Sequence, residues 1–286
     1  MTQRVRKTTL LVAFALFQFP LVHLWFSPIL AVVGARQGVL VATLLTYGTL
    51  AATALLFGRA YCGWCCDGAA IQECCTALGA KRLEGRRYWS KYVIFGAWLA
   101  AVAGGFLYAG GFHRVDLQFG MSGALPIRPF LLLYGPFLIH VPLSFLVGRW
   151  AFCHYGCWIA PLMIIGGRLK ERVGWPSLRM AADPGNCLEC EACAEACPMS
   201  LDVPRMVLAS AMRSDECILC GSCAAACPSG AVRFSFSRPG QSAGPKAASR
   251  RPESVTPPTS ASMIRFGAPH FIQAELSGNT QIAQII

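Results

Sequence analysis

Charged residues are scarce in this sequence. Asp, Glu, Lys and Arg make up 14% of the 286 residues, and hydrophobic residues make up 55%, whereas an average soluble protein has about 25% charged residues. The sequence also lacks a Gly-rich nucleotide loop, a catalytic triad and a zinc-protease motif, so neither NAD nor ATP chemistry is indicated. The composition favours a membrane protein.

Four long stretches contain no charged residue at all. They are residues 8–35, 37–58, 92–112 and 129–148, with lengths of 28, 22, 21 and 20 residues. A bilayer core about 30 Å thick is crossed by about 20 apolar helical residues, so we expect four transmembrane helices. A cleaved signal peptide is the alternative for the first stretch, but that stretch is too long and the cleavage-like site near Gly34 is weak.

The positive charges are unevenly distributed around these stretches. Of the 17 Lys and Arg residues before residue 183, 14 fall on one side of the expected membrane. The other side has only Arg36, Arg114 and Arg128. The positive-inside rule then places both termini in the cytoplasm. Because topology accounts for the net charge of +11, and no basic surface interleaved with aromatic residues appears, we expect no nucleic-acid partner.

A short repeat closes the second and fourth stretches. The segments are FGRAYCGWCC at 57–66 and VGRWAFCHYGC at 147–157. Each contains Gly-Arg, an aromatic residue and Cys-x3-Cys, and each is followed by a segment too short to span a bilayer. We expect two copies of one unit, each made of two helices, a cysteine pair and an interfacial or re-entrant helix.

Eight of the 15 cysteines form two copies of a tight motif. CLECEACAEACP contains Cys187, Cys190, Cys193 and Cys197, and CILCGSCAAACP contains Cys217, Cys220, Cys223 and Cys227. This is the spacing of bacterial two-cluster ferredoxins, in which three thiolates of a motif hold one [4Fe–4S] cluster and the fourth binds the other. The predicted ligands are Cys187, Cys190, Cys193 and Cys227 for cluster 1, and Cys217, Cys220, Cys223 and Cys197 for cluster 2.

A pair of structural zinc sites is the alternative for these eight thiols, because tetrahedral zinc also binds four thiolates. Zinc sites usually pair Cys-x2-Cys knuckles that lie far apart, whereas here four cysteines fall within eleven residues, twice. Iron–sulfur clusters are therefore favoured. Disulfides are not expected where cysteines face a reducing cytoplasm.

The remaining seven cysteines lie near the repeat. They are Cys62, Cys65, Cys66, Cys74, Cys75, Cys153 and Cys157. Each motif contributes two cysteines, Cys62 and Cys66 in the first and Cys153 and Cys157 in the second. If the repeats face each other, these four thiols would form a four-thiolate site, with Cys74 and Cys75 as spare ligands. The interpretations are a third metal or redox centre, a thiol–disulfide relay, or small buried hydrophobic residues.

The expected fold class is an all-α four-helix transmembrane bundle, made of two 2-helix repeats, plus a small α+β ferredoxin domain and a disordered tail. The expected boundaries are 1–170 for the membrane domain, 171–182 for a linker, 183–237 for the ferredoxin domain and 238–286 for the tail. The tail is rich in Pro, Ser, Gly and Ala, a composition that cannot bury a core.

Together these features resemble the membrane-bound ferredoxins of the NapH/NosR type. That family includes the quinol dehydrogenase subunit of periplasmic nitrate reductase systems and MauN, the ferredoxin-type protein of methylamine utilisation. The resemblance covers roughly residues 8–237. Both motifs keep the cysteines of the family's Cys-x3-Cys-Pro pattern, but Asp67 and Trp158 replace its proline and Cys65 is additional.

The resemblance implies a multi-pass protein of the bacterial inner membrane, with both termini and the clusters cytoplasmic. It would pass electrons between the quinol pool and a partner redox protein, such as a cytochrome or ferredoxin subunit, in nitrate reduction or methylamine utilisation. An electron carrier or quinol dehydrogenase component fits better than a stand-alone enzyme, and no catalytic residue is assigned. The alternative is a maturation factor that supplies electrons or thiol reduction for assembling a partner enzyme's cofactor.

Overall fold

The structure is a computed structural model that describes residues 3–17, 25–79, 81–83, 88–119 and 129–239. Met1–Pro245 form one compact unit, and a second unit, Lys246–Ile286, lies outside the described residues. The tail expected at 238–286 therefore falls almost wholly outside them, and its disorder stays a prediction.

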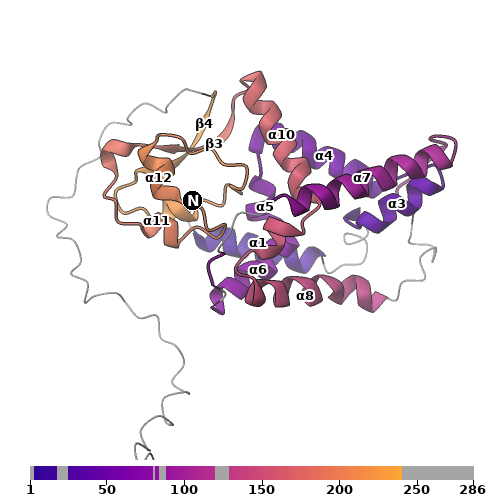
Figure 1. Cartoon of the computed structure of the whole chain (residues 1–286), viewed down its shortest axis with the longest axis horizontal. Coiled ribbons are helices and arrows are strands. Elements are labelled where there is room, and N and C mark those ends of the chain that lie inside the picture. Colours follow the sequence, from indigo (N-terminus) through magenta and orange to yellow (C-terminus); the bar gives the residue numbers. More distant parts are fainter. Residues whose placement is uncertain (1–2, 18–24, 80, 84–87, 120–128, 240–286) are drawn as a thin grey trace, which may run out of the picture. The chain divides into compact units, whose positions relative to one another are not determined.

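The fold is mixed, with many helices and two small sheets (Figure 1). The first elements are α1 (Gln3–Phe17), α3 (Pro28–Arg36), β1 (Val39–Val41), α4 (Ala42–Phe57), α5 (Ala60–Trp64), α6 (Asp67–Ala77), α7 (Ser90–Tyr108), β2 (Arg114–Asp116), α8 (Pro129–Leu146), α9 (Ala151–Tyr155) and α10 (Ile159–Val173). They are followed by β3 (Ser177–Ala182), the 3-10 helix η1 (Pro184–Asn186), α11 (Ala192–Glu195), α12 (Val203–Leu208), α13 (Ser222–Ala226) and β4 (Val232–Ser237).

The expected four-helix transmembrane bundle is wrong. Within the described residues one helix, α7, is long and apolar enough to cross a bilayer. The first uncharged stretch is shared between α1 and α3, and Pro28 begins α3, a position that proline favours. The second stretch starts with strand β1, which leaves α4 with 16 residues. At 1.5 Å per residue α4 is about 24 Å long, less than the bilayer core.

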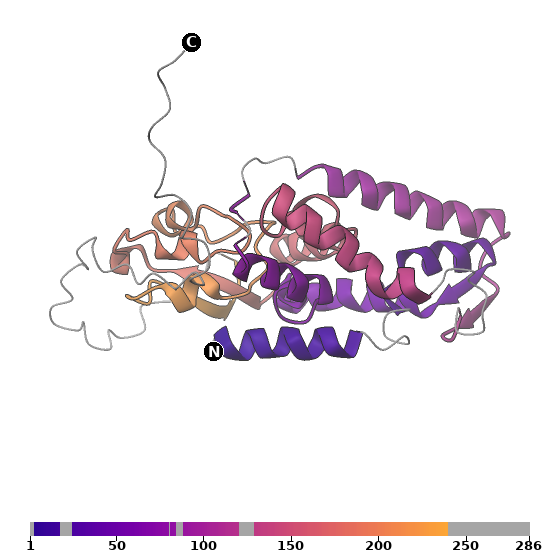
Figure 2. The same ribbon diagram turned by 90° about the horizontal axis from the view of Figure 1, so that it is seen from below.

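The helices pack in pairs, and the two sheets each join distant segments. α3 packs against α7, α4 against α10, and α6 against both α1 and α8, as Figures 1 and 2 show. β1 pairs in parallel with β2. β3, from the end of the expected linker, pairs antiparallel with β4 and so joins the two ends of the ferredoxin segment.

The two repeat motifs fold alike. In both, a Gly-Arg pair follows a longer helix, and the glycine has positive φ, +56° at Gly58 and +143° at Gly148, a conformation that suits glycine best. A five-residue helix follows, α5 or α9, with Cys62 or Cys153 as its third residue. Two successive amides after each helix then donate to one carbonyl oxygen, in each case that of the helix's second residue.

One hydrophobic core joins the repeat to the ferredoxin segment. Its buried members include Cys62 and Trp150 from the repeat, and Met199, Ile218 and Cys220 from the cysteine-rich loops. Burial of apolar surface is the main stabilising contribution to a fold. The cluster-binding loops are therefore held against the repeat by the same core that holds the helices.

Candidate functional site

The two ferredoxin motifs form loops of the same backbone shape. In each loop, φ is positive at the residue before the second cysteine, at the residue after it, and three residues beyond the last cysteine. These residues are Glu189, Glu191 and Ser200 in the first motif and Leu219, Gly221 and Gly230 in the second. The conformation costs about 1–3 kcal/mol at a non-glycine residue. Its occurrence at matched positions fits two loops that wrap around the same kind of group.

Four cysteines line each of two cavities. The first cavity is lined by Cys187, Cys190, Cys193 and Cys227, and the second by Cys197, Cys217, Cys220 and Cys223. The last cysteine of each motif thus lies with the first three of the other, which is the arrangement that the spacing predicts. A set of four thiols is the donor set that a [4Fe–4S] cluster requires. We call these cavities the first and second cluster sites.

Burial raises the pKa values of several of these thiols, and hydrogen bonds lower that of one. Burial raises the pKa of Cys217 to about 12 and also raises the pKa values of Cys223 and Cys193. At Cys227 burial is outweighed by hydrogen bonds from Ser229 and backbone amides, which lower the pKa. Because iron binds the thiolate, loading the second cluster site must displace protons from buried thiols.

Two arginines at equivalent repeat positions hold the main chain of the second cluster site. Arg149 donates to the carbonyl oxygen of Cys197 at 2.7 Å. Arg59 donates to the carbonyl oxygen of Asp215, two residues before Cys217, at 2.6 Å. Both arginines are buried. The repeat therefore positions two of the four ligand segments of this site.

Helix α5 touches the second cluster site directly. A Cβ at Gly63 would lie 2.5 Å from the carbonyl oxygen of Ile218 and 3.2 Å from Cα of Cys220. Beside it, Nε1 of Trp64 donates to the carbonyl oxygen of Leu219 at 3.0 Å. Glycine is needed at position 63 because the two backbones lie in contact.

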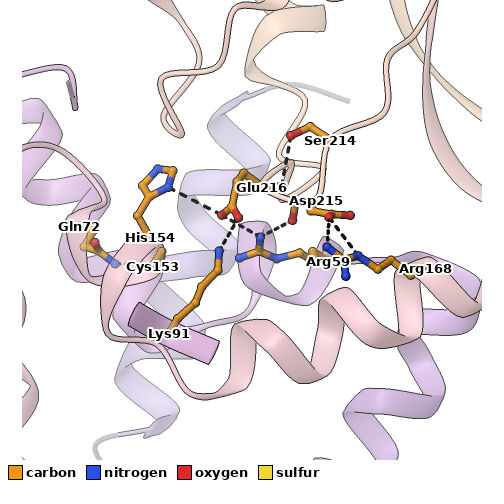
Figure 3. Close-up of polar contacts among 9 residues, drawn as sticks. All are labelled: Arg59, Gln72, Lys91, Cys153, His154, Arg168, Ser214, Asp215 and Glu216. Atoms are coloured by element: carbon orange, nitrogen blue, oxygen red, sulfur yellow. Dashed lines mark hydrogen bonds and ion pairs between the residues drawn. The ribbon is translucent and has the colours of Figure 1, made fainter. Parts of the chain in front are cut away.

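Glu216 is the centre of a buried charge network next to Cys217 (Figure 3). Its carboxylate forms ion pairs with Lys91 and, at 3.5 Å, with Arg59, and Nδ1 of His154 lies 3.7 Å away. Burial lowers the pKa of His154 to about 4, against the attraction of Glu216, so this histidine is neutral at pH 7. Two buried cations therefore share one carboxylate.

The structure gathers the cysteines at the repeated positions, Cys62, Cys66, Cys153 and Cys157, which we call the four-cysteine group. Cys62 and Cys153 lie in the same buried core, and Cys66 packs against it. Gln72 of α6 donates to Sγ of Cys153 at 3.0 Å. The charges of Cys62 and Cys157 act on both Cys66 and Cys153. Burial raises the pKa values of Cys66, Cys153 and Cys157, that of Cys157 to about 11.

The other cysteines of this region do not join the group. Cys74 is exposed, and Cys75 packs with Ile71 in a separate small cluster. Cys65 is half-buried. In the part of the chain that the structure describes, no three Cys, His, Asp or Glu side chains are placed to hold a lone metal ion, and this includes the thiols of both cluster sites and of the four-cysteine group.

A larger cavity of about 750 Å³ adjoins the second cluster site. Its lining includes Cys217, the apolar side chains of Met163 and Met180, and the cations Arg59 and Lys170. Nε of Arg59 is buried and has no hydrogen-bond partner among the described residues. The volume falls within the range of about 300–1,000 Å³ that is common for small-molecule sites.

Several residues of this site had no role predicted from the sequence. Arg59 and Arg149 carried a usable signal, because Gly-Arg occurs at the same place in both repeats. Lys91 and Glu216 carried none, since they are 125 residues apart and meet only through tertiary packing. Gln72 likewise reaches Cys153 across 81 residues.

Two protein-family models match parts of the chain. A 4Fe-4S dicluster domain matches residues 186–232, and a 4Fe-4S binding domain matches residues 39–84. No curated protein and no solved structure matches. The chain is an iron–sulfur protein of the ferredoxin type with a role in electron transfer. It holds two [4Fe–4S] clusters, and this prediction is confirmed.

The matches describe the cofactor and leave the narrower family open. The resemblance to membrane-bound ferredoxins of the NapH/NosR type stays a prediction, and so does the division into domains at residues 170 and 183. The first match spans all eight ferredoxin cysteines, and the second includes Cys62 and Cys66. Cys153 and Cys157 lie outside both matched ranges.

Proposed function

We propose that this protein carries electrons between the quinol pool of a membrane and a partner redox protein. The observation that carries the proposal is the cavity of about 750 Å³ beside Cys217. A quinone headgroup is a flat apolar ring with oxygen atoms that accept hydrogen bonds. Met163 and Met180 would contact the ring, and the unpaired Nε–H of Arg59 would donate to an oxygen.

Each cluster supplies reversible one-electron chemistry when it is bound, and the residues of the chain position it. The proposed ligand sets are those that line the two cavities: Cys187, Cys190, Cys193 and Cys227 at the first site, and Cys197, Cys217, Cys220 and Cys223 at the second. Because Cys217 also lines the larger cavity, the second cluster is the one that exchanges electrons with the quinone.

The first cluster is the better placed of the two to meet a partner protein. Cys190 is exposed, whereas Cys197 and Cys220 of the second site are buried. Leu188, in the same loop as Cys190, is 64% exposed. Because electron transfer weakens steeply with distance, a partner that docks on this loop would exchange electrons with the first cluster.

A membrane location is supported by the apolar surface of α7. Its Val93, Leu99 and Leu107 side chains are 57%, 50% and 82% exposed. Exposure of so much apolar area to water is unfavourable, and large exposed patches mark surfaces that another apolar phase covers. The lipid bilayer is the phase that would also contain the quinol.

The test is anaerobic electron exchange with a soluble quinone analogue. Decylubiquinol is added to the oxidised protein in detergent, and decylubiquinone to the dithionite-reduced protein. We expect the EPR signal of the reduced clusters either to appear in the first mixture or to disappear in the second. If neither mixture changes the cluster signal, the quinol proposal is wrong.

A variant that fills the larger cavity tests whether the quinone exchanges electrons with the protein there. Gly167 lines the cavity, and a Cβ there would meet no atom within 4 Å, so Gly167→Phe fills the space without a clash at the backbone. We expect it to slow exchange with the quinone by at least about tenfold, while dithionite still reduces both clusters. Gly96→Phe is the matched control, since position 96 is equally open but lies on α7 away from the cavity.

A further inference from the structure

We propose that the four-cysteine group binds a third [4Fe–4S] cluster, which exchanges electrons with the cluster at the second site. This goes beyond the proposed function, which needs only two clusters. The match to a 4Fe-4S binding domain, residues 39–84, includes Cys62 and Cys66. The pairing of these residues with Cys153 and Cys157 comes from the structure.

The first support is the convergence of two similar motifs. Cys62 and Cys153 occupy the same position in α5 and α9 and are buried in one core. The hydrogen bond from Gln72 to Cys153 connects the helix that follows the first motif to the second motif. Two loops that each contribute two thiols would supply the four thiolates that a [4Fe–4S] cluster requires.

The second support is the buried positive charge around this group. Arg59 interacts electrostatically with Cys62, Cys153 and Cys157 as well as with Glu216. Lys91 is buried and pairs with the same carboxylate, so two cations face one anion. A buried charge without a partner is strongly unfavourable. A cluster with four thiolate ligands carries net negative charge and would balance the excess.

The third support is a short connection to the second cluster site. Gly63 follows Cys62 directly, and its backbone lies against Cys220, a proposed ligand of the second cluster. Trp64 then donates to the carbonyl oxygen of Leu219 in the same loop. One electron would pass between the clusters, oxidising one and reducing the other, and no bond forms, no bond breaks and no proton moves.

A thiol–disulfide relay explains these features less well. A relay needs two thiols and moves two electrons with two protons, whereas the group has four thiols and adjoins a one-electron carrier. The contacts of the group also favour bound thiolates, because Gln72 donates to Cys153 and Arg59 supplies a nearby cation.

Iron content tests the proposal. The full chain is purified anaerobically in detergent, and iron and acid-labile sulfide are measured relative to the EPR spin count of the ferredoxin clusters, so that partial loading does not distort the ratio. Three clusters require about twelve irons and two require about eight. We expect about twelve, with a third component in the Mössbauer spectrum.

Serine variants identify the ligands. The double variant Cys62→Ser with Cys153→Ser should lose about four irons and the third spectral component, while both ferredoxin signals remain. Cys74→Ser with Cys75→Ser is the matched control and should keep all three. A wild-type ratio of about eight irons overturns the proposal even if the double variant fails to fold. Disulfides among these four cysteines, found by mass spectrometry alongside that ratio, would establish the relay instead.

Discussion

Arg149 is a buried arginine that donates hydrogen bonds to main-chain oxygens and to Oγ of Ser200. It donates to Cys197 at 2.7 Å and to Glu195 at 3.3 Å, and no carboxylate of the described residues forms an ion pair with it. Its charge lies beside the backbone of a cluster ligand, Cys197. A cation in that place favours the more negative, reduced state of the cluster.

Replacing Arg149 should therefore change the second cluster selectively. Arg149→Gln removes the positive charge, so we expect the reduction potential of the second cluster to fall while that of the first is unchanged. An EPR-monitored redox titration of the full chain measures both. Arg82→Gln, which removes a more exposed arginine paired with Glu195, is the control. A fall of similar size in both clusters would contradict a local effect.

Gly63 tests the contact between α5 and the second cluster loop. A methyl group at this position would lie 2.5 Å from a backbone oxygen, and overpacking of a close contact costs about 1–3 kcal/mol. Gly63→Ala should lower the melting temperature of the full chain and increase protease cleavage of the loop at residues 217–223.

The control for Gly63 is another helical glycine. Gly48, in α4, has no atom within 4 Å of the place that a Cβ would take, and Ala is favoured over Gly in a helix by about 1 kcal/mol. Gly48→Ala should therefore leave the melting temperature unchanged or raise it. If the two variants behave alike, close backbone contact is not what requires glycine at position 63.

Elements of this fold were predictable to different degrees. Three cysteines of each cluster site lie within seven residues of one another, so local spacing brings these thiols together. The fourth comes from the other motif and depends on how the two motifs pack. The first two of the four expected spans failed because a lack of charge does not imply a continuous helix: Pro28 starts a new helix and β1 occupies the start of the second stretch. The contact between Lys91 and Glu216 depends on packing between distant elements. The periodicity of the sequence does not predict such contacts.

Helix α7 makes the membrane proposal testable at the level of one element. Leu99 of α7 and Leu208 of α12 are each 50% exposed, so hydroxyl radicals in water should oxidise them equally. In lipid nanodiscs we expect Leu99 to be protected and Leu208 to be oxidised, because lipid excludes the radical from α7. Equal oxidation of the two leucines would show that lipid does not cover this helix.

Across the molecule the two cluster sites have opposite electrostatic surroundings. The loop of the first site contains Glu189 and Glu191 and has an exposed ligand, Cys190. The second is buried against Arg59 and Arg149. Negative neighbours disfavour the reduced cluster and positive neighbours favour it, so the two clusters cannot be equivalent.

We expect the second cluster to have the higher reduction potential. A redox titration should resolve two steps, and Glu189→Gln with Glu191→Gln should raise only the lower one, since these carboxylates lie beside the first cluster. The variants also report on the partner, because their loss of charge should change the salt dependence of reduction of cytochrome c, a basic probe. A single step, or a shift of the upper one, would contradict this assignment.

The hydrogen bonds from Arg59 and Arg149 to the main chain of the second cluster site have a consequence for how the protein is assembled. The first site draws its ligands and its immediate loops from residues 187–193 and 227, a segment made late in synthesis. The main chain of the second site is also held by Arg59 and Arg149, which come into place only when both halves of the repeat have folded. Loading of the second cluster would therefore act as a checkpoint, and a chain arrested before its helices assemble should contain the first cluster alone.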